Sequence, residues 1–228
     1  MATLYMVPTP VGNLQDMTFR AIEVLRNVQT VLAEDTRVTG NLLRHFDIPT
    51  KMFALHQNNE HRMVERLVER MAMGEDMAMV TDAGTPGISD PGFLLVREAI
   101  KAGIDIITLP GATAFVPALV NSGLPSDKFF FEGFLPQKKG RATRIAAIAA
   151  MPCTVILYES PHKLLKTLEQ LQEVCGPEKP ISVSREISKM YEETVRGSIA
   201  EVLAHFTAHG VRGEFVMVLG AADGHREP

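Results

Sequence analysis

Tryptophan is absent from this chain, and cysteine is nearly so. Among 228 residues there are two cysteines, Cys153 and Cys175, and aromatic residues make up only 6%. Neither cysteine has metal-ligand spacing around it, so we expect two structural thiols in a reducing cytosol. The seven histidines show no HxxxH-like spacing with acids, and we therefore expect no metal site.

Long hydrophobic runs and an excess of positive charge are also missing. No apolar stretch approaches the ~20 residues that span a bilayer, so we expect no membrane partner. The N-terminal MATLYMVPTP has no basic region ahead of an apolar one, which favours a cytoplasmic location over secretion. The formal net charge is −4, so a nucleic-acid partner would have to bind a local patch or a dimer surface.

What is present in the first half is an alternation of strands and helices. Hydrophobic residues make up 46% of the chain, an ordinary globular balance. The strands are expected at 4–7, 30–33, 51–55, 76–80 and 104–109. The helices are expected at 18–27, 61–72 and 93–102, with a further helix that follows the sequence EDTR at 34–37 and ends at Phe46. The runs 76–80 and 104–109 are nearly continuous in apolar residues, which is typical of parallel strands covered on both faces. The pattern predicts a parallel sheet with helices on both sides.

The second half has a different pattern. The turn-forming sequence NSGLPSD at 121–127 predicts a boundary between an N-terminal α/β domain, 1–121, and a C-terminal mixed α+β domain, 122–228. Strands are expected at 128–133, 154–158, 181–185, 191–195 and 214–220, and helices at 140–150, 162–174 and 198–208. The short gap around 187–190 predicts an antiparallel strand pair.

Three loops rich in glycine and proline follow predicted strands of the first half. The most informative is TDAGTPGISDPG at 81–92, and the others lie at 8–12 and 110–114. In open α/β sheets, ligands bind at the carboxyl ends of the strands, and glycine lets the backbone approach them closely. We therefore interpret 81–92 as a ligand loop, and the three loops should converge if their strands are neighbours.

Seven short strings along the chain carry a resemblance to a known family. They are VPTPVGNL from Val7, AEDTR from Ala33, TDAGTPGISDPG from Thr81, LPGATA from Leu109, YESPHK from Tyr158, SREISK from Ser184 and RGEFV from Arg212. The sequence resembles the tetrapyrrole-methylase-like superfamily of S-adenosylmethionine-dependent methyltransferases, and within it the ribosomal RNA methyltransferases. The DAGTPGISDPG and ESPHK strings are the most specific.

The resemblance implies a fold, a reaction and partners. The fold would be bilobal and tetrapyrrole-methylase-like, with a folded cofactor in the cleft between the lobes. The reaction would be 2′-O-methylation of a cytidine ribose in the decoding region of 16S ribosomal RNA. The partners would be that RNA within the small ribosomal subunit and a second copy of the chain in a homodimer.

The loops suit S-adenosylmethionine, which carries no phosphate. None of the three contains Lys or Arg, and the phosphate-binding pattern GxxxxGK is absent from the chain. Such a cofactor needs backbone amides and carbonyls more than basic side chains. The residues that we expect to bind the cofactor are Pro8, Gly12, Asp82, Gly84, Thr85, Pro86, Ile88, Thr113, Ala114 and Tyr158.

The catalytic candidates come from the densest charged cluster of the second half. A ribose hydroxyl is a weak acid, so its methylation needs a nearby cation or base. The cluster contains both types of group, and its candidates are Arg185, Glu186, Lys189 and Glu193. The competing interpretation is a solvated hairpin tip, the usual meaning of a charge run.

Other polar groups have a functional and a structural interpretation. Glu34, Asp35 and Arg37 either face the ligand or form a capping and ion-pair cluster at a helix start. In HQNNE at 56–60, an asparagine helix cap is favoured over catalysis. For Glu159 and His162 of YESPHK, we favour a functional position. The basic run Lys138, Lys139, Arg141 and Arg144 is a candidate contact for RNA phosphates, or a solvated helix start.

Two further hypotheses remain open. A tetrapyrrole C-methyltransferase would share the fold. A non-catalytic ribosome factor that binds S-adenosylmethionine would share the loops, and it gains weight because the resembled family often continues beyond the point corresponding to Gly220. Methyl transfer to purified small subunits separates all three.

Overall fold

The computed structural model describes residues 2–222 and divides the chain into two compact units, one ending at Thr113 and the other beginning at Ala114. The boundary expected from the sequence, at residue 121, lies within helix α5 (Phe115–Ser122). This helix is counted with the second unit because it packs on strands of that unit's sheet.

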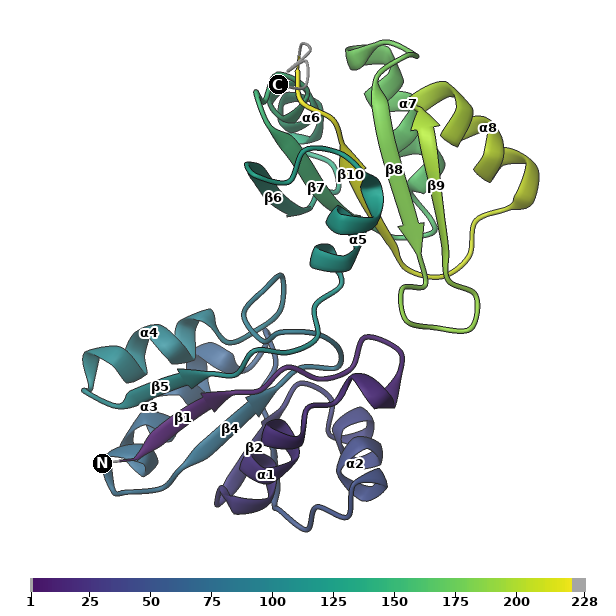
Figure 1. Ribbon diagram of the computed structural model, residues 1–228. Coiled ribbons are helices and arrows are strands. Elements are labelled where there is room, and N and C mark those ends of the chain that lie inside the picture. Colours follow the sequence, from purple (N-terminus) through teal and green to yellow (C-terminus); the bar gives the residue numbers. More distant parts are fainter. Residues whose placement is uncertain (1, 223–228) are drawn as a thin grey trace. The chain divides into compact units, whose positions relative to one another are not determined.

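The first unit is built on a five-stranded parallel sheet (Figure 1). The strands are β1 (Thr3–Met6), β2 (Thr30–Ala33), β3 (Met52–Ala54), β4 (Met77–Val80) and β5 (Asp105–Thr108), in the order β3-β2-β4-β1-β5. β1 pairs with both β4 and β5, and β2 pairs with both β3 and β4. The chain leaves β1 toward β2 and leaves β4 toward β5, so these two neighbouring strands send their connections in opposite directions. Open α/β sheets bind ligands at such a point, where the connections of two neighbouring strands diverge.

Helices cover both faces of this sheet, as predicted from the alternating pattern. One face packs against α1 (Phe19–Asn27) and α2 (Thr36–His45), and the other against α3 (Glu60–Ala72) and α4 (Phe93–Lys101). Strand β4 supplies Met77 and Met79 to the second face and Ala78 and Val80 to the first, because successive side chains of a strand point to opposite sides. A short 3-10 helix, η1 (Leu14–Asp16), precedes α1.

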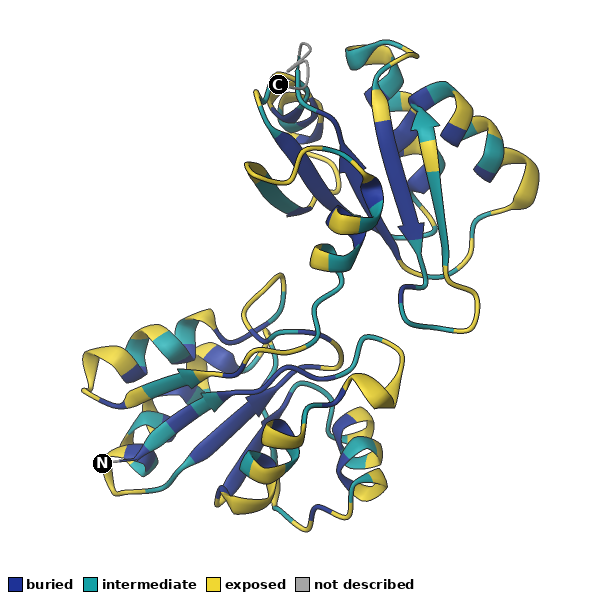
Figure 2. Cartoon of the chain, in the orientation of Figure 1, coloured by how far each residue is buried: buried dark blue, intermediate teal, exposed yellow. Residues whose placement is uncertain are grey.

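One expectation for this sheet is wrong. β4 is buried at all four positions, but β5 is an edge strand whose Asp105 and Thr108 are exposed. Figure 2 shows exposed and half-buried residues along this side of the sheet. The apolar run 104–109 is buried mainly at its two ends, Ile104 and Leu109. Apolar content alone does not distinguish a central strand from an edge strand, since both bury at least one face.

The second unit contains a mixed five-stranded sheet in the order β6-β7-β10-β8-β9. The strands are β6 (Phe129–Phe134), β7 (Thr154–Glu159), β8 (Pro180–Arg185), β9 (Glu193–Ser198) and β10 (Phe215–Leu219). Only β6 and β7 are parallel, and the remaining pairs are antiparallel. The expected antiparallel pair is β8 with β9.

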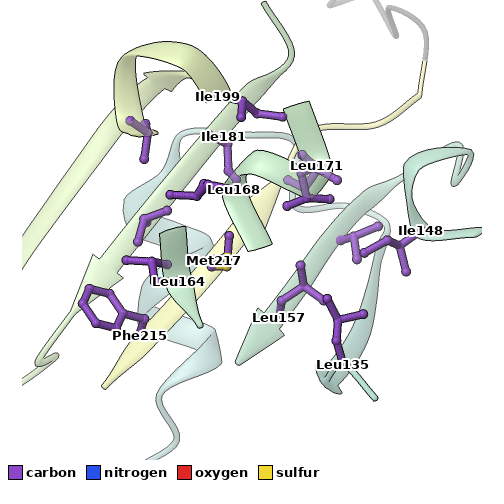
Figure 3. Close-up of a cluster of buried hydrophobic side chains, with 14 of the residues drawn as sticks. Leu135, Ile148, Leu157, Leu164, Leu168, Leu171, Ile181, Ile199, Phe215 and Met217 are labelled. Atoms are coloured by element: carbon purple, nitrogen blue, oxygen red, sulfur yellow. The ribbon is translucent and has the colours of Figure 1, made fainter. Parts of the chain in front are cut away.

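The main core of this unit lies on one face of its sheet (Figure 3). There α6 (Arg141–Ala149), α7 (Leu164–Cys175) and α8 (Ile199–His209) pack on the strands through a shared set of aliphatic side chains. The labelled members include Leu164, Leu168 and Leu171 of α7 and Met217 of β10. The other face is covered by α5 through Ala118 and Leu119. Helix α5 was not predicted.

The fold class predicted from the sequence is confirmed: a parallel α/β unit is followed by a mixed-sheet α+β unit. Within residues 2–222, none of the helices has the length and apolar character needed to cross a bilayer.

Candidate functional site

Two of the three glycine-rich loops are joined by backbone hydrogen bonds. The Thr9 amide donates to the Gly84 carbonyl at 2.9 Å, and the Gly84 amide donates to the Thr9 carbonyl at 2.8 Å. The Thr9 hydroxyl donates to the Thr81 carbonyl at 3.0 Å. These bonds fix the loop after β1 against the loop after β4, at the carboxyl ends of neighbouring strands.

The third loop, after β5, contacts both of the others. The Thr85 hydroxyl donates to the Ala112 carbonyl at 3.1 Å. A Cβ on Gly111 would lie 2.8 Å from Cβ of Pro8, so only glycine permits this approach. The three loops predicted to converge therefore meet in the first unit, and we call this meeting point the three-loop junction.

Glycine is also required within the 81–92 loop for conformational reasons. Gly84 has a φ of +81°, and an added Cβ would contact Val11 and the Ala112 carbonyl. Gly92 has a φ of +132°, and a Cβ there would lie 2.9 Å from Cε of Met6. Both positions have a positive φ, which residues other than glycine adopt poorly, and at Gly92 the neighbouring Met6 also leaves no room for a Cβ.

The end of this loop is held by a carboxylate from another helix. Glu60, the first residue of α3, is buried, and its Oε1 accepts hydrogen bonds from the amides of Gly92 and Leu95, each at 3.2 Å. Helix α4 has no side-chain cap from its own N-cap residue, Gly92. Glu60 therefore caps the start of α4, and this interaction explains its burial.

Acidic side chains gather at the carboxyl ends of β2 and β4. Partial removal from water raises the pKa of Glu34 and of Asp82, and the nearby carboxylates reinforce the effect. Burial, followed by the charges of Glu34 and Asp82, raises the pKa of Asp90 to about 6. We call Glu34, Asp82 and Asp90 the acidic rim; its charges repel one another and would be relieved by a cation.

Two of the alternatives left open by the sequence now have structural answers. Asp35 caps α2 by accepting from the Arg37 amide at 2.8 Å, and it pairs with the Arg37 guanidinium, so these two residues form the capping and ion-pair cluster. Asn59 occupies the N-cap position of α3, but its side chain does not cap that helix. It accepts from the His56 amide and donates to the Ala54 carbonyl instead.

The residues predicted to bind the cofactor differ in their surroundings. Pro8, Gly84 and Pro86 are buried, Thr85 and Thr113 are half-buried, and Gly12, Asp82 and Ile88 are exposed. All of these belong to the first unit, whereas Ala114 and Tyr158 belong to the second. The Tyr158 ring packs edge-on against Phe131 and Phe134, with centroids 5.2 and 5.5 Å apart.

The catalytic candidates of the second unit form two charge networks at one end of β8. In the first, Nε of Arg185 lies 3.1 Å from Oε2 of Glu193, without the alignment of a hydrogen bond. Oε1 of Glu193 is 2.9 Å from Nε2 of His205 on α8. Glu193 therefore bridges the arginine and the histidine, a partner that the sequence did not suggest.

The second network is centred on Lys189. Its ammonium donates to Oε1 of Glu186 at 2.9 Å and to Oε2 of Glu214 at 2.8 Å. Burial opposes the charge of Lys189, but the two carboxylates outweigh it and raise the lysine's pKa. Burial also opposes the charge of Glu186, yet the Glu214 amide and Lys189 lower its pKa. Lys189 is therefore a cation near neutral pH rather than a base.

The structure gives Glu159 a structural role, as the partner of Arg141 in a buried ion pair. Its carboxylate is buried and accepts from the Thr167 hydroxyl at 2.6 Å, and it lies 3.4 Å from Nη2 of Arg141. Arg141 is itself buried and also donates to Gln170 and to the Pro136 carbonyl. A buried Arg141 cannot contact RNA phosphates, and it is not a solvated residue at a helix start. Both interpretations of the basic run are therefore wrong for Arg141.

The remaining members of that run differ from one another. Arg144 donates from Nε and Nη2 to the two carboxylate oxygens of Glu132, and its guanidinium lies 5.5 Å from the Phe130 ring centroid. Lys138 and Lys139 are exposed. Of the four residues of this basic run, these two lysines remain as candidate phosphate contacts.

Family comparison identifies the fold and its relatives. Residues 3–203 match the model of the tetrapyrrole (corrin/porphyrin) methylases. The chain belongs to this family. It is 45% identical to the ribosomal RNA small subunit methyltransferase I of Synechocystis sp., over 100% of this chain and 82% of that protein. It is 46% identical to the protein of the same name from Escherichia coli O157:H7, over 98% and 78%.

A solved structure of the family has the same architecture. Uroporphyrin-III C-methyltransferase from Thermus thermophilus, complexed with S-adenosyl homocysteine, superposes with a TM-score of 0.66 at 19% identity, covering 96% of this chain and 97% of that one. At this identity the likeness concerns the tetrapyrrole methylase fold. The resemblance inferred from the seven sequence strings is confirmed by the family match.

Sequence reasoning missed several residues that now stand out. Asp90 lies in the most informative loop but was not named as a site residue, because nothing in a single sequence reveals its burial near two other acids. His205 lies 12 residues from its partner Glu193, and no local spacing links them. No group of three or more His, Cys, Asp or Glu residues that could hold a metal occurs within residues 2–222.

Proposed function

We propose that this protein transfers a methyl group from S-adenosylmethionine to the 2′-hydroxyl of a cytidine in the decoding region of 16S ribosomal RNA. The observation that carries the proposal is 45–46% identity, over 98–100% of the chain, to proteins named ribosomal RNA small subunit methyltransferase I. The cytidine and the 2′-hydroxyl are the finer parts of the proposal and come from the resemblance of the sequence strings.

The three-loop junction suits this cofactor in its chemistry. Its donors and acceptors are backbone groups and threonine hydroxyls, and no Lys or Arg occurs at 8–12, 84–90 or 110–114. The positive φ of Gly84 and the close contact of Gly111 with Pro8 favour glycine at both positions, so no side chain projects from the main chain there. A cofactor with adenine, ribose and an amino acid, but no phosphate, is matched by such groups.

The acidic rim adds electrostatic complementarity. S-adenosylmethionine carries a sulfonium and an ammonium but only one carboxylate, so its net charge is positive. Asp82 lies in the same loop as Gly84, and its Oδ1 accepts from the Asp35 amide at 3.1 Å, which orients the carboxylate. The product has lost the sulfonium charge, so these acids favour binding of the methyl donor over the product.

The remaining chemistry falls to the second unit. When bound, the cofactor supplies a methyl group already activated on a sulfonium. Arg185 and Lys189 are the cations that we assign to the acceptor oxygen, where a positive charge favours loss of the hydroxyl proton to water. Glu193 and Glu186 are assigned to hold these two cations in place. Positioning in well-oriented systems supplies ~7–11 kcal/mol, so fixed side chains matter as much as their charge.

The proposal is tested by methyl transfer to RNA. Purified small subunits that lack the modification are incubated with the protein and S-adenosylmethionine labelled in its methyl group, and the modified nucleotide is identified by nuclease digestion and mass spectrometry. We expect label on the ribose of one cytidine of 16S RNA. Label on a base, or on a tetrapyrrole supplied in parallel, contradicts the proposal; cofactor binding without transfer to either acceptor supports a non-catalytic factor.

We also propose that the chain acts as a homodimer in the cytoplasm, where ribosomal subunits are assembled. The family resemblance is what supports a dimer. Sedimentation equilibrium of the purified chain tests this part separately from the reaction. A single species at the 25.1 kDa mass of one chain would contradict it.

A further inference from the structure

A cavity of about 310 Å³ lies between the starts of α3 and α4. It belongs to the first unit and is reached at the far end of the 81–92 loop from Gly84. Pockets of this size accept small ligands. Its lining residues are Gln57, Glu60, His61, Asp90, Pro91, Gly92, Phe93, Leu94 and Arg97. We call it the α3–α4 cavity.

The edge of this cavity carries an exposed aromatic ring beside a cation. Phe93, the first residue of α4, is 69% exposed, although no structural need places a phenylalanine at a helix start in water. Arg97 follows one turn later, and its guanidinium lies 5.6 Å from the Phe93 ring centroid. Its Nε also donates to Oε1 of Glu98 at 2.9 Å.

The two acids that line the cavity play different parts. Glu60 already has a structural role, because its carboxylate caps α4 by accepting from the amides of Gly92 and Leu95. Within the described residues, no hydrogen bond is found for the half-buried carboxylate of Asp90. An ionised carboxylate only accepts hydrogen bonds, so Asp90 presents an unused acceptor to whatever enters the cavity.

We propose that the α3–α4 cavity binds one unstacked cytosine of the substrate RNA, with the base on Phe93, its exocyclic amine on Asp90, and its phosphate near Arg97 and His61. This inference rests on the proposed function and names the residues that would recognise the base. Proteins read unpaired RNA bases by stacking them on aromatic rings and arginine planes and by hydrogen bonding to their edges.

The choice of cytosine rests on the proposed function, and its discrimination from uracil follows from the hydrogen-bonding groups. Carboxylates pair with the N4 amine of cytosine, which donates where uracil has an acceptor oxygen. A carboxylate facing uracil would place two acceptors against each other and lose affinity. A cationic peptide would also satisfy Asp90, but it would then meet Arg97 and His61 at the same cavity.

The first test uses nucleotides and the full chain labelled with ¹⁵N. Cytidine 5′-monophosphate and uridine 5′-monophosphate are titrated separately in the presence of saturating S-adenosyl homocysteine, which excludes binding at the cofactor site. We expect shifts of the Gly92, Phe93 and Leu95 amides with the cytidine nucleotide and at least roughly fivefold weaker binding of the uridine nucleotide. Equal binding of the two, or no shift at these amides, overturns the proposal.

The second test uses variants with a matched control. Phe93→Ala should raise KM for small subunits about tenfold, because one stacked base is lost. Phe19→Ala is the control, since Phe19 is 94% exposed at the start of α1 on the other face of the sheet. Both variants should retain cofactor affinity. An unchanged KM for Phe93→Ala removes the stacking role.

The third variant, Asp90→Asn, tests base recognition through the preference between the two nucleotides, which a purely structural role of Asp90 would not change. Asp90→Asn replaces an acceptor by a group that also donates, so it should narrow or reverse the preference for the cytidine nucleotide over the uridine nucleotide. An unchanged preference contradicts base recognition by Asp90. Failure of the wild-type chain to methylate small subunits would instead refute the proposed function, and the nucleotide titration would still report on the cavity.

Discussion

The backbones of Thr9 and Gly84 donate to each other across two loops, at 2.9 and 2.8 Å, although the residues lie 75 positions apart in sequence. The pair stands where the connections of β1 and β4 diverge, the place at which sheets of this kind bind ligands. The bridge uses the backbone amide and carbonyl of one residue in each loop. It therefore fixes the backbone of the three-loop junction without consuming any side chain.

Gly84→Val should weaken binding of S-adenosyl homocysteine. A β-branched residue at a φ of +81° is strained by roughly 1–2 kcal/mol, and its side chain would meet Val11 and the Ala112 carbonyl. Calorimetric titration measures the affinity, and thermal unfolding reports the accompanying loss of stability.

Gly74→Val is the matched control for that experiment. Gly74 follows α3, has a φ of +99°, and nothing lies within 4 Å of an added Cβ. This variant should lose stability through the same backbone strain but bind the cofactor normally. If both variants lose affinity equally, backbone strain and not the junction controls binding. If neither loses affinity, Gly84 does not contribute to the cofactor site.

Arg185→Ala and Lys189→Ala should each lower single-turnover methyl transfer at least ~10-fold, corresponding to ~1.4 kcal/mol of activation free energy. The reason is the loss of a cation that favours ionisation of the acceptor hydroxyl. Cofactor affinity should change little. Lys101→Ala removes a lysine from an i,i+3 ion pair of the same 2.9 Å length and serves as the control. Full turnover by both cluster variants, with intact folding, would exclude this cluster from the mechanism.

Arg141→Ala should destabilise the second unit by roughly 3–5 kcal/mol, the usual cost of removing one partner of a buried ion pair. Glu159 would be left buried without its counter-ion, and the bonds to Gln170 and Thr167 would be lost. Denaturant unfolding measures the change. Lys139→Ala, two residues away and exposed, should leave the unfolding midpoint unchanged; a similar midpoint for both variants would refute the buried network.

Replacing Lys138 and Lys139 together by alanine should weaken binding to small subunits and flatten its salt dependence. Two lost contacts to single-stranded phosphates reduce the slope of log affinity against log salt by about 1.4. Binding is measured by filter retention between low and moderate salt. If the parental slope persists, these lysines are simply solvated, and RNA must be bound elsewhere.

Asp90→Asn should stabilise the protein near neutral pH but not in acid. The pKa of Asp90 is raised to about 6 in the folded protein from an ordinary value of 3.8, so ionisation disfavours the folded state. Below about pH 4 the carboxyl is neutral in both states, and the variant gains nothing.

The stability gained by Asp90→Asn over the wild type should therefore increase between about pH 4 and 6 and stay constant at higher pH. Thermal midpoints of variant and wild type at a series of pH values measure it. Asp127→Asn, at an exposed position, is the control. A gain that is independent of pH would mean that the Asn side chain improves packing or hydrogen bonding rather than relieving charge.

Local patterns were sufficient for most of the fold. Thr18 was expected to begin a helix, and its side chain accepts from the Ala21 amide at the start of α1. Helix α5 was missed because its sequence, FVPALVNS, contains Pro117 and is apolar on nearly all sides, so it lacks a polar face to mark a period. Proline is tolerated there because it lies in the first turn.

The site was predictable only where backbone conformation determines it. Glycines and prolines predicted the three loops, because few other residues permit those turns. Charged side chains gave no such signal: Arg141 and Lys139 are both basic and two residues apart, yet one is buried against Glu159 and the other is exposed. Their environments depend on α7, which packs beside α6 from a distant part of the chain.

The capping of α4 by Glu60 has a consequence for the order of folding. Gly92 offers no side chain to satisfy the first amides of its helix, so the local sequence gives α4 a weak start. The missing acceptor arrives only when α3 has formed and its first residue has reached Gly92 and Leu95. Helices α3 and α4 thus gain stability as one cooperative unit, and the end of the 81–92 loop becomes fixed in the same event.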